Sequence, residues 1–461
     1  MPFTVSRLTE FCSRKELVNQ TGYEFRDWPL VIIKELIDNS LDSAEEVGVA
    51  PSILVEISGD VIAVTDNGPG IPASIIEQVL NYAIRVSSRE AYVSPTRGAQ
   101  GNALKTILPM GYVLSEHLGE DASGETIIEA HGVAHHIRFS VDHIKQEPKI
   151  AHTTETSSLP SGTRIRAKLP KPKVYEYENE NYFDDLIADS RDSIIRLVES
   201  YAWINPHLTL QLIWNGENVI DIKASNPDWK KWLPTWPTSP HWYDLGRFRR
   251  YMAAHISNRP SITVREFISE FDGMTSTAKQ KLVLAETGAS HMSLHNYFGL
   301  HKANIENIAK LLASLKAHSK PVKPEALGII GKEHLFRMFE ASGGEPATFK
   351  YTRTTGVAAG IPRVIEVAFG IHRDGLTAAG RVPAAKSISG VNWSPGIHNP
   401  FRQLGHNGVS LDAILSEVRA SASQPVIVAL HVAMARVAYL DRGKTRIVIE
   451  GEGVTEKDND E

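Results

Sequence analysis

One amphipathic segment, 28–46, limits the folds open to this chain more than any other stretch. Its apolar side chains recur every three or four residues, which is the period of a helix that packs one face against a core. Pro29 is tolerated in the first turn of such a helix, and Asp27 is a suitable N-cap. The pattern therefore predicts a helix with one buried face and one polar face.

The polar face carries Glu35, Asn39 and Asp42, which follow one another after four and three residues and so share one side of the helix. A carboxylate can orient and deprotonate a water, and an amide oxygen one turn away can serve Mg²⁺ as a neutral ligand. Acidic helix faces are more often simply solvated. This stretch alone therefore leaves both a metal-nucleotide site and a solvated surface open.

A second motif follows two expected strands, 53–57 and 61–65, which a short turn joins into a hairpin. The second strand runs into Asp66, Gly68 and Gly70, with Pro69 between the glycines. Such a segment makes a tight turn, and an aspartate at a strand end can accept a hydrogen bond from an exocyclic amine. An ordinary loop is the alternative interpretation. Further on, the pattern predicts a helix at 73–84, strands within 111–137 and a polar loop at 143–158.

A glycine-containing loop, 97–106, forms the third motif. It leads into an apolar run with helical character, and a polar, irregular stretch at 85–96 before it suggests a lid. Glycines before a helix N-terminus let backbone N–H groups approach phosphates. The segment is not a Walker loop, because the Gly-Lys-Ser/Thr ending is absent. On its own it is weak evidence for a phosphate site.

These motifs stand in a fixed order, and Ser161-Gly162-Thr163 opens a further strand after them. In this order they resemble the Bergerat (GHKL) ATP-binding fold of type II topoisomerases, mismatch-repair MutL, heat-shock chaperone ATPases and histidine kinases. Later blocks are similar, in the same order, to the B subunit of topoisomerase VI. They lie at 204–207, 241–246, 327–331, 364–368 and 431–444.

The resemblance implies an α+β fold class with three units. We expect a Bergerat α/β sandwich ATPase domain with an N-terminal arm at 1–225 and a helical, helix–two-turns–helix-like domain at 226–345. A transducer-like α/β domain follows at 346–455, and an acidic tail at 456–461. The segment 229–242 holds four tryptophans. It is interpreted as a rigid connector between the units rather than as a platform for stacking bases.

The resemblance also implies roles for single residues, with ATP and Mg²⁺ as cofactors. Glu35 would be the general base, Asn39 the Mg²⁺ ligand, and Asp66 the acceptor for the adenine amine. Lys444 would reach the γ-phosphate from the transducer, whereas by itself it would be interpreted as a surface lysine. The other residues expected to bind the nucleotide are Gly68, Gly70, Ser87, Ser88, Gly98, Ala99, Gln100, Gly101, Asn102, Ala103, Leu104, Lys105 and Thr163.

The chain departs from the family pattern in three places. Asn102 and Ala103 replace the usual Ile-Gly pair of the glycine loop, and the lid has Ser87-Ser88-Arg89 in place of the usual Ser-Lys pair. The sequence ends 17 residues after Lys444, so we expect a shortened transducer. We find no candidate tyrosine with an acidic metal-binding cluster, so we do not expect strand cleavage by this chain.

Charge and composition limit the classes of partner and the compartment that we expect for this chain. The formal net charge of −5 excludes a global attraction to nucleic acid. Any DNA surface must therefore be local, for instance the basic clusters at 247–250 and 310–323, which solvated helix faces also explain. A single cysteine, Cys12, indicates a reducing compartment. With no signal-peptide pattern and no apolar run near the ~20 residues of a membrane helix, we expect a cytoplasmic protein without membrane contact.

The resemblance implies an ATPase that homodimerises on ATP binding and forms a gate. It would be the ATP-binding subunit of a topoisomerase VI-like complex that acts on double-stranded DNA with a separate DNA-cleaving subunit. The alternative is a stand-alone ATP-gated clamp or interaction protein that drives a different effector, for example in DNA repair or anti-phage defence.

Overall fold

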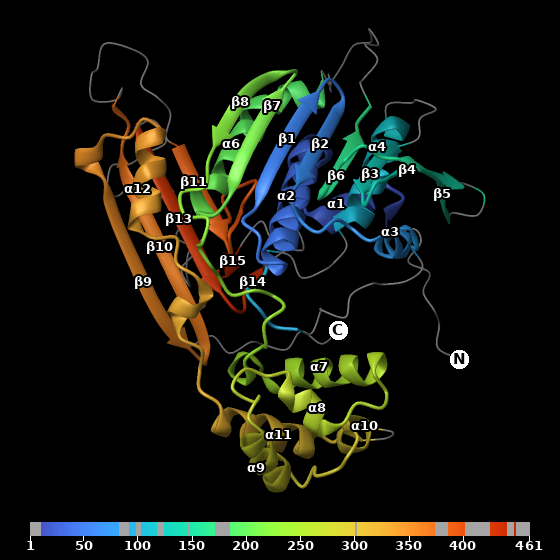
Figure 1. The fold of residues 1–461 in the computed structure, drawn as a ribbon, viewed down its shortest axis with the longest axis vertical. Helices are drawn as coiled ribbons and strands as arrows, with labels where there is room; N and C mark the ends of the chain where they lie inside the picture. Colours follow the sequence, from blue (N-terminus) through green and yellow to red (C-terminus); the bar gives the residue numbers. More distant parts are fainter. Residues whose placement is uncertain are drawn as a thin grey trace.

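The computed structural model describes eleven segments of the chain, which contain two large β-sheets, a two-stranded sheet and a separate group of helices (Figure 1). The predicted α+β class is confirmed. The described residues are 11–82, 92–97, 103–117, 124–142, 144, 147–170, 185–299, 302–373, 386–401, 425–439 and 447–448.

The larger sheet has eight strands in the order β5-β4-β3-β6-β2-β1-β7-β8. All neighbours pair antiparallel except β1 and β7, which run parallel. The predicted hairpin is confirmed, with Ser58 opposite Val61. The strands are β1 (Ser52–Ser58), β2 (Val61–Asp66), β3 (Gly124–Ala130), β4 (Val133–Asp142), β5 (Glu147–Thr156), β6 (Thr163–Lys168), β7 (Thr209–Trp214) and β8 (Glu217–Ile222).

Helix α2 (Trp28–Glu46) forms as the apolar period predicts, and it packs against β2, α4 and α6. Its apolar side chains are almost fully buried, and burial of each such side chain stabilises the fold by about 1.5–3 kcal/mol. The helix therefore has little freedom to shift on the sheet. The remaining elements of this layer are α1 (Arg14–Thr21), η2 (Phe25–Asp27), α3 (Ala73–Leu80), α4 (Ala103–His117), α5 (Leu186–Asp189) and α6 (Arg191–Ile204).

The second sheet has the order β12-β11-β13-β10-β9. Helix α12 (Lys332–Ala341) packs against both α6 and β10, so one hydrophobic core runs from the first sheet into the second. Two short strands, β14 and β15, pair with each other. The strands are β9 (Lys350–Ala358), β10 (Ile361–Ile371), β11 (Lys386–Val391), β12 (Ser394–Pro395), β13 (Val426–Met434), β14 (Ala438–Tyr439) and β15 (Ile447–Val448).

The helical group lies below the two sheets in Figure 1 and has a core of its own. Aromatic rings fill it, and the connector tryptophans Trp232 and Trp242 belong to it with ring centroids 5.1 Å apart. Trp236 is 40% exposed. This packing fits the connector interpretation of 229–242. The helices are α7 (Leu245–Asn258), α8 (Val264–Ser269), α9 (Thr277–Thr287), α10 (Leu294–Phe298) and α11 (Ile305–His318), with the short turns η3 (Pro240–Trp242), η4 (Pro324–Leu327) and η5 (Pro346–Thr348).

Several local expectations are wrong. Residues 111–117 continue helix α4, and 147–156 form the edge strand β5, whose mostly exposed side chains lack an apolar alternation. The helix expected at 73–84 is α3, which ends at Leu80. Asp27 occupies the N-cap position of α2 without a side-chain cap, and its carboxylate lies 3.1 Å from His398 Nε2.

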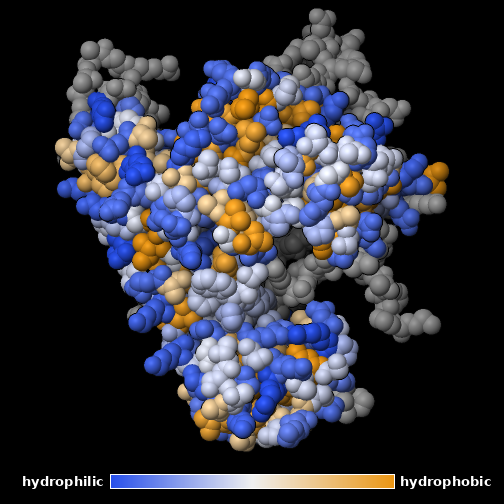
Figure 2. Space-filling view, in the orientation of Figure 1, coloured by the Kyte–Doolittle hydropathy of each residue, from blue (hydrophilic) through white to orange (hydrophobic). Residues whose placement is uncertain are grey.

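The surface in Figure 2 is mostly hydrophilic, with apolar residues in scattered groups. In the described segments, we find no helix with the length and apolar character needed to cross a lipid bilayer.

Two buried histidines give a prediction for the pH dependence of stability. Burial lowers the pKa of His431 to about 3 and that of His334 to about 4, so both imidazoles stay neutral in the folded protein. The unfolded chain binds protons at these positions below about pH 6.5. Because the unfolded state then holds more protons, the free energy of unfolding decreases as the pH is lowered. The decrease is about 1.4 kcal/mol per pH unit for each histidine.

We therefore expect the melting temperature to drop as pH is lowered from about 6.5 towards 4.5, and to drop less steeply in His334→Gln. Thermal unfolding followed by circular dichroism over this range measures both slopes. A His334→Gln slope equal to that of the wild type would contradict the assignment, whatever the absolute stability of the variant.

Candidate functional site

Asp66 lies at the end of β2 with a buried carboxylate that several donors hold in place. Its Oδ1 accepts from Gly68 N at 2.9 Å and from Thr163 N at 3.1 Å, and its Oδ2 accepts from Ser40 Oγ at 3.0 Å. Burial raises the pKa of Asp66, and these hydrogen bonds oppose the shift. A carboxylate offers about four acceptor positions. The three donors therefore leave Asp66 Oδ2 one position for a further donor.

Three glycines lie close to Asp66 in positions where a side chain would clash. Gly162, with φ +79°, has no room for a side chain, since a Cβ there would lie 1.9 Å from Asp66 O. Gly68 packs on α2, because its Cβ would lie 2.7 Å from Ser43 Oγ. Gly70, with φ +86°, faces His131 in the same way. The structure thus brings Asp66, Gly68, Gly70 and Thr163 together with α2, as the order of motifs predicts.

Glu35 and Asn39 are one turn apart on α2, next to Ser40, which binds Asp66. Glu35 is half-buried and Asn39 is exposed. Within the described part of the chain, neither side chain has a hydrogen bond or ion pair, whereas Asp38 and Glu45 of the same helix have several. Asp42 belongs to the second group, because Arg97 lies 2.6 Å from its Oδ1. Two of the three polar groups predicted to share a face are therefore available to a ligand.

Helix α4 begins at Ala103, so the last residues of the predicted phosphate loop form its first turn. Ala103 is half-buried, and Leu104 and Lys105 are buried. Lys105 Nζ donates to Asn81 O at 2.7 Å, and Tyr82 Oη donates to Lys105 O at 2.9 Å. These bonds fasten the first turn of α4 to the end of α3. A contact of Lys105 with phosphate stays a prediction.

Eight predicted site residues lie outside the described residues. They are Ser87, Ser88, Gly98, Ala99, Gln100, Gly101, Asn102 and Lys444.

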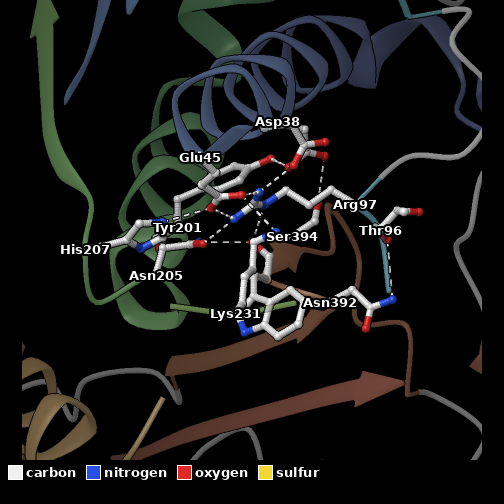
Figure 3. A network of polar contacts seen from close by, with 12 residues as sticks. Asp38, Glu45, Thr96, Arg97, Tyr201, Asn205, His207, Lys231, Asn392 and Ser394 are labelled. Carbon is white, nitrogen blue, oxygen red and sulfur yellow. Dashed lines mark hydrogen bonds and ion pairs between the residues drawn. The ribbon is translucent and has the colours of Figure 1, made fainter. Parts of the chain in front are cut away.

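A buried polar network beside this site was not foreseen from the sequence (Figure 3). Arg97 binds both carboxylate oxygens of Glu45, at 2.7 and 2.6 Å. Glu45 also lies 2.9 Å from His207 Nε2 and 2.8 Å from Lys231 Nζ. Arg97 further donates to Asn205 Oδ1 at 2.8 Å. The network therefore joins α2, the chain before the glycine loop, the end of α6 and the connector.

Glu45 stays charged in this network. Burial by itself favours the neutral acid, but the charges of Arg97 and Lys231 outweigh burial and hold the pKa of Glu45 well below its usual range. One signal in the sequence indicates the network, since Asp38 and Glu45 lie three and four residues from the buried Leu41, on the apolar stripe of α2. Buried acids need partners. The identity of those partners cannot be read from helical spacing.

A comparison with protein families gives one match. Residues 26–173 match the model of the family described as histidine kinase-, DNA gyrase B- and HSP90-like ATPase. This span begins just before α2, ends after β6 and contains Glu35, Asp66 and Thr163. The GHKL resemblance is thereby confirmed over residues 26–173.

Among curated proteins, the chain is similar to the B subunit of type 2 DNA topoisomerase 6 from Archaeoglobus fulgidus, with 23% identity over 439 residues. This alignment covers 91% of the chain and 66% of that protein. The protein of the same name from Methanococcoides burtonii is 25% identical over 447 residues, which cover 91% and 64%. The chain thus spans slightly less than two thirds of the length of these relatives.

Among solved structures, the ATPase region of Saccharomyces cerevisiae topoisomerase II matches 91% of this chain and 76% of its own. The TM-score is 0.38 and the identity is 14%.

Because Gly162 packs closely against Asp66, we expect that one added methyl group at position 162 lowers the stability of the fold strongly. Gly162→Ala should lower stability through its left-handed backbone, by about 1–2 kcal/mol, and by a further ~1–3 kcal/mol through the clash with Asp66 O. Gly132→Ala is the matched control, because Gly132 has φ +76° and no atom within 4 Å of a Cβ. Urea unfolding of both variants measures the difference. Equal losses would contradict the close approach.

Proposed function

We propose that this chain couples ATP binding by its ATPase domain to homodimerisation. It would then be the ATP-binding subunit of a topoisomerase VI-like, DNA-processing complex. The observation that carries the proposal is the extent of the alignment, which continues past residue 173 and covers 91% of the chain. The helical group and the second sheet are thus part of the similarity. A separate subunit would cleave the DNA.

The proposed adenine site is centred on the carboxylate of Asp66. The free acceptor position on Asp66 suits an exocyclic amine. Because Gly68 N, Thr163 N and Ser40 Oγ already fix the carboxylate, it would receive the adenine without rearrangement. The role of Thr163 is then to donate from its backbone to Asp66.

The hydrolytic side of the proposal uses the two available groups of α2. Glu35 would orient the attacking water and accept its proton. Asn39 fits a bound Mg²⁺, because its exposed amide oxygen has no competing partner in the described chain and this metal needs few protein ligands beside phosphates and waters. The metal would neutralise charge on the phosphates. Lys444 would contact the γ-phosphate and so distinguish ATP from ADP.

The DNA partner is the least constrained element of the proposal. The helical group carries exposed cations that suit phosphate contacts. Arg247 and Lys316 are already engaged, with Asp244 and with Tyr243 O. The exposed candidates are Arg249, Arg250, Lys310, Lys320 and Lys323.

The proposed chemistry predicts different effects at Glu35 and Asp66. Glu35→Gln should bind ATP as the wild type does and hydrolyse it about a hundredfold or more slowly, since only the base is lost. Asp66→Asn should bind ATP about tenfold or more weakly. The side-chain amide N–H group of the variant would face donors, among them the adenine amine, where the carboxylate oxygen accepts. Calorimetry and phosphate release measure the two effects. Glu46→Gln, at the exposed end of α2, is the control, and normal turnover by Glu35→Gln would refute its role as base.

The gate is tested by the molar mass in solution. Light scattering without nucleotide, with ADP, and with a non-hydrolysable ATP analogue plus Mg²⁺ should show a dimer only with the analogue. The Lys444→Ala variant should remain a monomer. If ATP binds and the mass does not change, the gate is excluded, and the alternative of an ATP-binding interaction protein with a different effector is favoured.

A further inference from the structure

The side chain of Arg97 is fully buried and has its polar contacts in two parts of the molecule. In the first sheet's layer, it forms a fork with Glu45 and lies 2.6 Å from Asp42. Towards the second sheet, its Nε donates to Trp393 O at 3.3 Å. The residue after Arg97 is Gly98, where the predicted phosphate loop begins. Arg97 therefore fixes the position from which that loop starts.

The contact with the second sheet involves three consecutive residues, of which Asn392 and Trp393 join β11 to β12 and Ser394 is the first residue of β12. Asn392 Nδ2 donates to Thr96 O at 3.4 Å, Trp393 O accepts from Arg97, and Ser394 Oγ donates to Asp38 Oδ2 at 2.8 Å. Figure 3 shows Asn392 directed at Thr96 and Ser394 directed at Asp38. We call residues 392–394 the coupling turn. It is bonded both to the chain before the glycine loop and to α2, the helix of Glu35 and Asn39.

The backbone of the coupling turn is strained. Asn392 has φ +49° and Trp393 has φ +65°, and an indole side chain at such a φ is unusual. Trp393 is completely buried, and its backbone N–H donates to His431 Nε2 at 3.1 Å. Strained backbone persists only where the surroundings hold it, and it often marks a functional element. Here the holding contacts come from both sheets' layers.

The other side of the turn is bonded to β13. Asn392 Oδ1 accepts from Met434 N at 2.9 Å, and Asn392 N donates to Val432 O at 2.9 Å. Strand β13 leads on along the chain towards Lys444. A continuous set of bonds thus runs from Thr96, just before the phosphate loop, to β13, which is followed in the sequence by β14 and then by Lys444.

We propose that Arg97 is a positioning residue for the phosphate loop and that the coupling turn makes nucleotide affinity depend on the second sheet. A shift of β13 or β11 would act on Asn392 and Trp393, and through them on Thr96 and Arg97. Because such coupling is reciprocal, nucleotide binding would in turn hold β11 and β13 more firmly. The inference rests on the proposed ATP site, and it adds a connection distinct from Lys444.

Asn392→Gly is the sharpest test, because it removes both side-chain bonds of Asn392 and leaves Arg97 and its ion pairs intact. Glycine adopts φ +49° without strain, so the variant should fold. The matched control is Asn215→Gly, since Asn215 has φ +48° between β7 and β8, and its Oδ1 accepts from Gly59 N at 3.0 Å. Arg97→Lys, which keeps the charge and loses the fork, is the second variant.

Two quantities are measured with a non-hydrolysable ATP analogue and Mg²⁺: affinity by calorimetry, and hydrogen exchange of peptides from 386–401 and 425–439. In the wild type and Asn215→Gly, the analogue should slow exchange in these peptides by about tenfold. In Asn392→Gly this slowing should be lost, and affinity should fall by about fivefold or more. Arg97→Lys should lose more affinity than Asn392→Gly.

The outcomes separate this inference from the proposed function. If the wild type binds no analogue, the ATP site itself is refuted, and the inference with it. If the wild type binds the analogue but Asn392→Gly matches it in affinity and exchange, the inference is overturned and the ATP site stands. A loss in Asn215→Gly equal to that in Asn392→Gly would likewise overturn it, because the effect would then be general.

Discussion

The fork between Arg97 and Glu45 is the interaction on which the arrangement of this molecule depends. Both side chains are buried, and burying an unpaired charge costs several kcal/mol. The charges of this group are balanced, because the two carboxylates of Glu45 and Asp42 pair with the two cations of Arg97 and Lys231. Removing one member of such a group typically costs about 3–5 kcal/mol, since a partner is left uncompensated. The network therefore selects one relative placement of α2, the connector and the end of α6.

The surroundings of Asp66 depend on that placement. Ser40 binds Asp66 from α2, and Gly68 packs against Ser43 of the same helix. Glu35 and Asn39 lie on α2 as well, so the position of this single helix sets the geometry of the proposed adenine side and of the proposed hydrolytic side together. Helix α2 is held in two ways, by the apolar face that is buried along its length and by the ion pairs of Glu45 at its C-terminal end.

Much of the fold and part of the site could be predicted from sequence, for physical reasons that are local. Helix α2 has a clear apolar period, and Asp66, Gly68 and Gly70 form a turn whose chemistry lies within five residues. Strand β5 was missed because an exposed edge strand needs no apolar alternation. The Arg97 network was missed because its members meet only in space. Arg97 and Trp393 are 296 residues apart, and no spacing rule joins them.

The parallel pairing of β1 with β7 has a consequence for synthesis of the chain. β1 ends at Ser58 and β7 begins at Thr209, so β1 lacks its neighbour on that side until much of the chain has left the ribosome. Lys231 and Trp393 arrive later still, and until then Glu45 and Arg97 lack contacts that the finished molecule supplies. Pairings of such long sequence separation form slowly and expose apolar surface meanwhile. The nascent chain therefore passes through an interval in which the strands of the first sheet are made but the proposed nucleotide site is unfinished, and chaperones have most to contribute in that interval.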